Sequence, residues 1–180
     1  KQAGGLPPTS TWNMALRTAA HSPGTLSVLA DLASAWNWPA EAEFTLWFAV
    51  EKYPDQAWPL RALDQFYMAR KDSAGFRRVC AARLQQNPED RHARNNYAMI
   101  SLLMNKDVAN AHKTAEALRA ADPQSPVFVS TYAFSLHLQG RTKEAISLLR
   151  GLALEQLDDP SLSLYFGIML AADGQSGAAQ

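Results

Sequence analysis

Apolar positions recur along this chain at the spacing of helix faces, and the pattern repeats from one segment to the next. Asn96-Tyr97-Ala98-Met99 and Thr131-Tyr132-Ala133-Phe134 match at a spacing of 35 residues, and Tyr165-Phe166-Gly167-Ile168 falls in nearly the same place. Apolar residues at i, i+3, i+4 and i+7 lie on one face of a helix, which a neighbouring helix can bury. The pattern predicts a series of amphipathic helices that pack on one another.

Prolines mark the period of this series. Pro54, Pro88 and Pro123 are 34 and 35 residues apart, and each closes a polar or charged segment. A second series places a capping side chain directly before a proline, at Ser22-Pro23, Ser125-Pro126 and Asp159-Pro160. Proline is tolerated in a helix only in the first turn, where Ser or Asp accepts a hydrogen bond from a free amide. These signals predict a structural repeat that restarts about every 34 residues.

The repeats are predicted near residues 23–56, 57–90, 91–125, 126–159 and 160–180, the last of them partial. The predicted helices are Gly24–Trp36, Pro39–Lys52, Ala57–Arg70, Ser73–Gln86, Arg91–Met104, Val108–Ala121, Pro126–Gln139, Thr142–Gln156 and Pro160–Ala172. Residues 1–8 are expected to be a linker or flexible tail. Residues 9–22 are expected to form a leading helix, or a cap of an incomplete repeat, from about Thr11 to Ala20. Since another helix should begin where the sequence stops, we expect the chain to be a piece of a longer protein.

One slot recurs in the turns that follow the predicted first helices. Gly140 and Gly174 are 34 residues apart, and each follows a helix where a left-handed residue ends it at little cost. The same slot in the other repeats is occupied by Asn37, Lys71 and Asn105. Asp107 and Thr142 suit the N-caps of the helices that follow.

With these features the chain resembles the tetratricopeptide repeat family from roughly Pro23 to the C-terminus. That family has helix–turn–helix units of about 34 residues, with small residues at the eighth and twentieth positions and proline at the thirty-second. The eighth positions here are Ala30, Ala98, Ala133 and Gly167, and the twentieth are Ala42, Ala111, Ala145 and Ala179. The third repeat fits only with one extra residue, expected in its inter-helix turn. The resemblance implies an all-α fold, a right-handed superhelical stack of antiparallel helix pairs, or α–α solenoid.

The second repeat departs from the family pattern. Asp64 and Phe76 stand where small residues are expected. This departure predicts that the helices of the second repeat splay or shift register.

The charge balance and hydropathy of the chain narrow the classes of partner that we expect. The chain has 17 basic and 17 acidic residues, whereas nucleic-acid and anionic-membrane surfaces show a basic excess. No apolar run approaches the roughly 18 residues that span a bilayer. We therefore expect neither nucleic-acid binding nor direct membrane insertion.

Cys80 is the only cysteine, which excludes an intrachain disulfide. It favours a reducing compartment such as the cytoplasm, and a periplasmic location stays open if the chain belongs to a larger exported or membrane-anchored protein.

Candidate catalytic and metal-binding patterns are missing from the sequence. The histidines, which show no metal-ligand spacing, are His21, His92, His112 and His137. We therefore predict no enzymatic activity, no metal and no cofactor.

Cys80 is expected to be a buried, inert thiol. All five tryptophans lie in the first 58 residues. Most of them are expected to pack, and Trp58 either contacts a partner or packs against the preceding repeat.

The resemblance also implies a partner-binding groove, because first helices line the inner surface in this family. The implied groove residues are Trp58, Arg61, Gln65, His92, Asn95, Met99, Leu102, Val127, Ser130, Phe134 and His137. If exposed, Met99, Leu102 and Phe134 would form an apolar patch that binds a partner, unless a further segment of a longer chain covers it. The residues that grip a C-terminal carboxylate in some family members are not matched, so binding of a chaperone tail is not expected.

The interpretation we favour is a protein–protein interaction scaffold that binds a peptide or helix of a partner in a concave groove, without catalysis. Two alternatives remain at this point. The chain could form a homo-oligomer through its terminal helices, or it could be a regulatory or docking segment of a larger enzyme or signalling protein. The sequence does not identify the partner, the pathway, the compartment or the oligomeric state.

Overall fold

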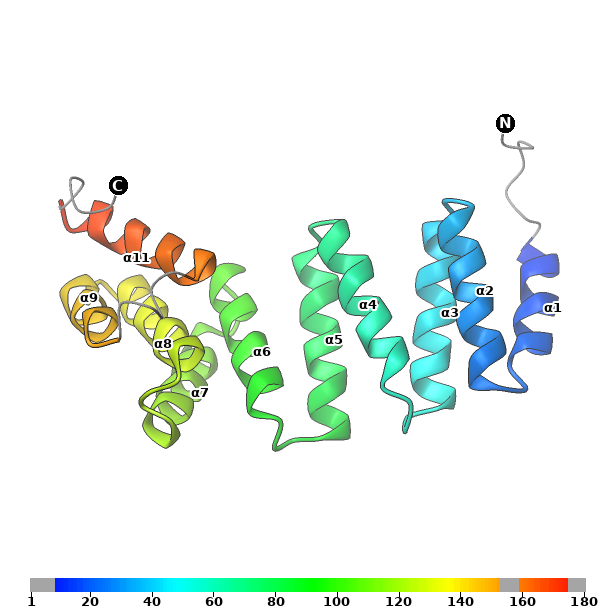
Figure 1. The fold of residues 1–180 in the computed structure, drawn as a ribbon, viewed down its shortest axis with the longest axis horizontal. Coiled ribbons are helices and arrows are strands. Elements are labelled where there is room, and N and C mark those ends of the chain that lie inside the picture. Colours follow the sequence, from blue (N-terminus) through cyan, green and yellow to red (C-terminus); the bar gives the residue numbers. More distant parts are fainter. Residues whose placement is uncertain (1–8, 153–158, 175–180) are drawn as a thin grey trace. The chain divides into compact units, whose positions relative to one another are not determined.

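The structure is a computed structural model that describes residues 9–152 and 159–174 (Figure 1). These residues form ten α-helices and no strand, as the repeat pattern predicted. The helices are α1 (Thr9–Ala19), α2 (Pro23–Ala35), α3 (Pro39–Lys52), α4 (Trp58–Ala69), α5 (Ser73–Gln86), α6 (Arg91–Leu103), α7 (Val108–Ala121), α8 (Pro126–Leu138), α9 (Thr142–Arg150) and α11 (Pro160–Ala172). The linker expected at residues 1–8 and Ala179 lie outside the described residues. The helix expected from Thr142 to Gln156 instead ends at Arg150, with Gly151 as its C-cap, and its expected residues 153–156 also lie outside the described residues.

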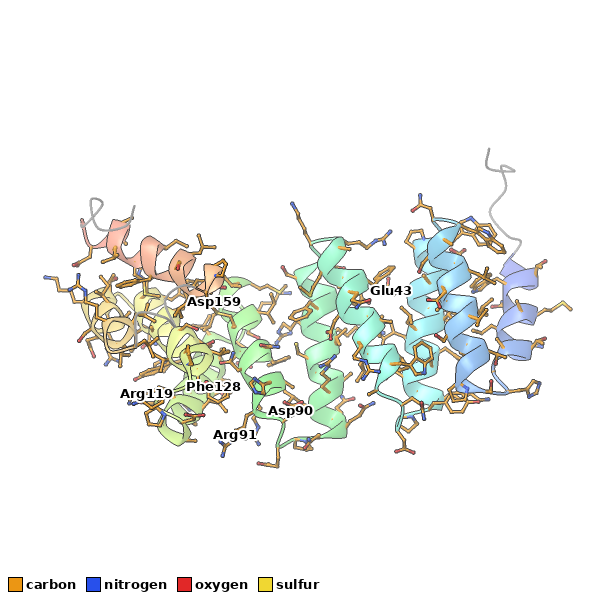
Figure 2. All side chains as sticks on the ribbon, viewed as in Figure 1. Glu43, Asp90, Arg91, Arg119, Phe128 and Asp159 are labelled. Atoms are coloured by element: carbon orange, nitrogen blue, oxygen red, sulfur yellow. The ribbon has the colours of Figure 1, made fainter. Side chains whose placement is uncertain are left out.

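Capping side chains begin several of these helices. Ser22 Oγ accepts a hydrogen bond from the Thr25 amide at 3.2 Å at the start of α2. Figure 2 labels Asp90 and Asp159, which do the same for α6 and α11, with distances of 2.9 and 3.1 Å. Prolines follow Ser22 and Asp159 as the first helical residues, as the sequence predicted.

Three expected caps make no capping hydrogen bond through their side chains, although Asp107 and Ser125 do occupy the N-cap positions of α7 and α8. Thr142 is the first residue of α9 and Arg141 precedes it as the cap, so the Thr142 hydroxyl bonds His137 instead. Asp107 has a φ of 50° and its carboxylate accepts a hydrogen bond from Asn110 Nδ2 at 2.8 Å. Ser125 stands before α8, but its side chain makes no capping hydrogen bond.

The predicted left-handed turn positions are confirmed. Gly140 and Gly174 have φ values of 78° and 77°. The non-glycine residues in the same slot are also left-handed, namely Asn37, Lys71 and Asn105. The turn between α6 and α7 has four residues where the turns before α3, α5 and α9 have three. The extra residue of the third repeat therefore lies in its inter-helix turn, as expected.

The chain divides into two compact units, residues 1–79 and 80–180, with the boundary inside α5. In the N-terminal unit, α2 packs on α1 and α3, and α3 packs on α4. Its core is built around Trp12, Leu16, Leu26 and Leu29, which are all less than 9% exposed. Trp12 and Leu16 face this core from α1, on the side predicted for the leading helix.

Small residues allow the helices of the C-terminal unit to approach closely. Ala98, Ala111, Ala133 and Ala145 are at most 5% exposed and belong to one core cluster. Within this unit α8 packs on α6, α7, α9 and α11. The first helices α6, α8 and α11 therefore pack in series, as in a helical-repeat stack.

The second repeat shows the register shift that its sequence suggested. Gly75, one position before Phe76, lies against the ring of Tyr67. Gly75 is buried, whereas Phe76 is partly exposed. The small residue that allows the neighbouring helix to approach therefore stands at position 75, one residue before the expected position 76.

Candidate functional site

The first helices of the C-terminal unit enclose a cavity of about 500 Å³, which we call the C-terminal cavity. Its lining residues are Asn95, Asn96 and Met99 from α6, Pro126, Val127, Ser130 and Thr131 from α8, and Asp159, Leu162 and Tyr165 at α11. The volume lies within the range of pockets that hold ligands. Four of the groove residues implied by the sequence meet here: Asn95, Met99, Val127 and Ser130.

Asn95 is the most unusual residue of the C-terminal cavity. Its side chain is 2% exposed, and its Oδ1 atom has no hydrogen-bond partner among the described residues. A buried acceptor without a partner costs roughly 1–3 kcal/mol. Asn95 lines the cavity, but its Oδ1 atom has almost no accessible surface, so an occupant reaches this acceptor only after the amide turns toward the cavity.

Three other polar side chains of the cavity are engaged as donors or caps. The hydroxyls of Ser130 and Thr131 each donate to the carbonyl of Val127 at 3.0 Å. Asp159, at the start of α11 (Figure 2), accepts the Leu162 amide. The hydroxyls of Ser130 and Thr131 keep free lone pairs that can accept hydrogen bonds, and the Asn96 amide and Tyr165 hydroxyl add donors to the lining.

Apolar side chains complete the walls of the cavity. Met99 and Tyr165 are partly exposed, and Val127 is 47% exposed. Burial raises the pKa of the Tyr165 phenol, so it remains protonated and uncharged. The cavity therefore combines apolar contact area with a few placed polar groups.

Six of the ten lining residues were not among the groove residues implied by the sequence, namely Asn96, Pro126, Thr131, Asp159, Leu162 and Tyr165. All but Leu162 stand in a pattern visible in the sequence. Asp159 and Pro126 belong to helix-start pairs, and Asn96, Thr131 and Tyr165 fall in the repeated aromatic segment.

The prediction of an exposed apolar patch at Met99, Leu102 and Phe134 is wrong, because two of the three side chains are buried. Leu102 is 2% exposed and Phe134 is 8% exposed, and both belong to the core of the C-terminal unit. The ring of Phe134 lies 5.3 Å from that of Tyr165. Because successive first helices pack directly on each other, these positions are covered by the next helix of the stack.

A second cavity of about 360 Å³ lies in the N-terminal unit and receives side chains from α2, α3 and α4. Gln65 lines it, whereas Arg61 and Trp58 do not. Trp58 is half-buried and packs against the core of this unit. Arg70 places its guanidinium carbon 4.4 Å from the centre of the Phe66 ring, a cation–π contact at the cavity wall.

Two histidines implied in the groove lie outside both cavities. His92 is exposed, and its ring lies 5.8 Å from that of Phe128. His137 Nδ1 is 3.0 Å from Thr142 Oγ1. Neither is a lining residue.

One histidine lies beside a serine, at a distance typical of a catalytic pair. His112 Nδ1 is 2.9 Å from Ser135 Oγ. Ser135 is 0% exposed, and its hydroxyl donates to the carbonyl of Tyr132 at 2.7 Å. A nucleophile must be accessible to substrate, so this contact joins α7 to α8 and does not form a reactive centre.

A buried tyrosine organises the polar contacts of the N-terminal unit. Tyr67 is 2% exposed, donates to Glu43 Oε1 at 2.6 Å and accepts from Trp47 Nε1 at 2.8 Å. Burial first, then the hydrogen bond to Glu43, raise the pKa of Tyr67 to about 12, against an opposing effect of Trp47. The guanidinium carbon of Arg78 lies 3.9 Å from the centre of the Trp47 ring, and Arg78 Nη1 lies 3.6 Å from Glu43 Oε1. These contacts hold α3, α4 and α5 together.

Cys80 is buried, as expected for an inert thiol. Across the described residues, no group of three or more His, Cys, Asp or Glu side chains is placed to hold a metal ion. Within the same residues, no helix is long and apolar enough to cross a membrane.

Comparison with known protein families supports the helical-repeat architecture of the C-terminal unit. Residues 102–164 match the tetratricopeptide repeat family. Among curated proteins, none matches this sequence.

Several solved structures share the fold at low sequence identity. A tetratricopeptide repeat protein from Parabacteroides merdae is 14% identical, with a TM-score of 0.68 over 94% of this chain and 67% of the other. MamA from Desulfovibrio magneticus RS-1 is 16% identical, with a TM-score of 0.59 over 87% and 88%. YrrB, described as having an unusual peptide-binding site, is 13% identical, with a TM-score of 0.55 over 93% and 86%. The fold is consistent with protein–protein interaction scaffolding.

Proposed function

We propose that this chain is an interaction scaffold that binds a peptide segment of a partner protein in the C-terminal cavity. The match of residues 102–164 to the tetratricopeptide repeat family and the shared fold support this proposal. The family is generally non-catalytic, and the proposed role involves no chemical step. Recognition relies on a preformed surface presented by stacked first helices.

The observation that carries this proposal is the unpaired Oδ1 of Asn95. The atom is buried at a wall of the cavity and has no donor among the described residues. Once the amide turns toward the cavity, a main-chain N–H of a bound peptide would satisfy it and restore the roughly 1–3 kcal/mol lost by leaving it unpaired. A peptide also presents such donors at regular intervals along its backbone.

The apolar walls give the bound peptide a second source of affinity. Met99, Val127 and Leu162 line the same cavity as Asn95. An aliphatic or aromatic side chain placed among them would remove apolar surface from water, at about 25 cal/mol per Å². YrrB, which has the same fold and a peptide-binding site, supports a peptide as the kind of ligand.

The test is a selection of peptides against the C-terminal cavity. Phage that display random peptides are selected on the wild-type protein and then assayed on Val127→Glu, which places a charge at an exposed cavity wall. Leu103→Glu is the matched control, because Leu103 is 50% exposed on α6 and does not line the cavity.

The proposal predicts peptides that bind the wild type and Leu103→Glu and do not bind Val127→Glu. Circular dichroism of each variant shows that the fold is retained. Selected peptides that bind all three proteins alike would refute the C-terminal cavity as the binding site.

A further inference from the structure

The N-terminal unit has a cleft between α1 and α3 that is separate from both cavities described above. Its volume is about 460 Å³, and we call it the α1–α3 cleft. Its lining residues are Asn13, Leu16, Arg17 and Ala20 from α1 and the residue after it, and Phe44, Phe48 and Lys52 from α3. On α3 these residues recur every fourth position, so they form one stripe along the helix.

The centre of the cleft is apolar. Leu16 is 6% exposed and belongs to the core of the N-terminal unit, so it forms the floor. Phe48 packs against that core, whereas Phe44 is 54% exposed. An exposed phenylalanine beside an apolar floor leaves a surface that gains free energy when a partner covers it.

The edge of the cleft is cationic. Arg17 and Lys52 stand in the last turns of α1 and α3, and both are exposed. The ion pairs found among the described residues include neither of them. Lys52 Nζ lies 5.9 Å from the centre of the Phe48 ring, which keeps its charge beside the apolar surface. Carboxylates are missing from the lining residues.

Helix stabilisation accounts for only part of this arrangement. A cation in the last turn of a helix interacts favourably with the helix dipole, and this effect explains the presence of Arg17 and Lys52 at two helix ends. It does not explain Phe44, which is 54% exposed in the same cleft. The combination of apolar centre and cationic edge is complementary to a ligand of the opposite charge.

We propose that the α1–α3 cleft binds an acidic amphipathic peptide segment of a protein partner. Its apolar side chains cover Phe44 and Phe48, and its carboxylates pair with Arg17 and Lys52. This second surface does not depend on the function proposed for the C-terminal cavity.

The probe is a fluorescein-labelled peptide with leucine and phenylalanine on one helical face and aspartate and glutamate on the other. Its binding is measured by fluorescence anisotropy against the wild-type chain. Two further peptides carry either amides in place of the carboxylates or alanine in place of the apolar residues. Both are expected to bind at least about tenfold more weakly, since each loses one of the two sources of affinity.

Charge reversal of the cleft is compared with charge reversal elsewhere. Arg17→Glu/Lys52→Glu is the test variant, and Lys106→Glu/Lys143→Glu, at two exposed positions outside the cleft, is the control with the same net charge. The acidic peptide is expected to bind the test variant about tenfold more weakly than the control. Phe44→Ser, at an exposed position, is expected to weaken binding without loss of the fold.

Three results would overturn the proposal. The wild-type chain could fail to bind the acidic peptide, or the two charge-reversal variants could bind it equally. The third is hydrogen exchange in which the bound peptide protects amides of α8 and not those of α1 and α3. Protection confined to α1 and α3 supports the proposal.

Discussion

The ring of Tyr67 lies against the backbone of Gly75, in the space that a Cβ atom at position 75 would need. The aromatic side chain of α4 thereby reaches the start of α5, whose first amides are capped by Asp72. The close approach of two helices in the second repeat thus depends on a glycine beside a large ring, where the other repeats use alanines.

Gly75→Ala is expected to destabilise the protein by roughly 1–3 kcal/mol, because the new methyl group overlaps the buried Tyr67 ring. This loss exceeds the gain of up to about 1 kcal/mol in helix propensity. Gly24→Ala is the control, since its Cβ would meet only Ser22 Oγ at 4.0 Å. Urea unfolding measures both variants. A Gly75→Ala protein as stable as Gly24→Ala would contradict the described packing.

Tyr67→Phe is expected to cost roughly 1–3 kcal/mol, because Trp47 Nε1 loses its acceptor and Glu43 loses its donor. Glu43→Gln, which keeps an acceptor for Tyr67, is expected to cost less. Thermal or urea unfolding at neutral pH gives both values. Equal stability of Tyr67→Phe and the wild type would show that the hydroxyl contributes nothing.

The same residue makes stability dependent on alkaline pH. The pKa of Tyr67 is raised from 10.0 to about 12 in the folded protein. A group with a raised pKa stabilises the fold fully below its unfolded pKa and loses that contribution as pH rises through the folded pKa. Wild-type stability is therefore expected to fall between pH 10 and 12 more steeply than that of Tyr67→Phe. Parallel stability curves over this range would be evidence against the shift.

Phe134→Ala is expected to cost roughly 3–5 kcal/mol, because Phe134 is 8% exposed in the core of the C-terminal unit. Leu138→Ala on the same helix is the control, since Leu138 is 46% exposed. Its expected cost is within about 0.5 kcal/mol, as for other surface changes. A small loss for Phe134→Ala would instead place its side chain on an exposed surface.

Local signals in the sequence were sufficient to locate the helices. Pro23 and Pro39 begin α2 and α3, because proline is compatible with a helix only in its first turn. The left-handed slot was also predictable, although Lys71 occupies it without the conformational freedom of glycine. These features depend on a few neighbouring residues, which a sequence displays directly.

The candidate site was less predictable, because burial depends on residues far apart in the chain. Phe134 was expected at an inner surface, but Tyr165, 31 positions later, contributes to its cover. The orphaned acceptor of Asn95 is likewise invisible in the sequence, where an asparagine in a first helix is unremarkable. The position of each residue in the family's repeat predicted approximately which surface lines the groove. Only the packing of α6, α8 and α11 showed which side chains line the cavity.

The central claim is that Asn95 contributes a ligand contact in the C-terminal cavity. The most direct measurement is the affinity of a peptide, selected on the wild-type protein, for Asn95→Leu. Replacing an unpaired buried amide by an apolar group of similar size should leave the free energy of unfolding unchanged or raise it. Affinity should fall about tenfold, the equivalent of one lost hydrogen bond. An Asn95→Leu protein that binds the peptide as tightly as the wild type would contradict the claim.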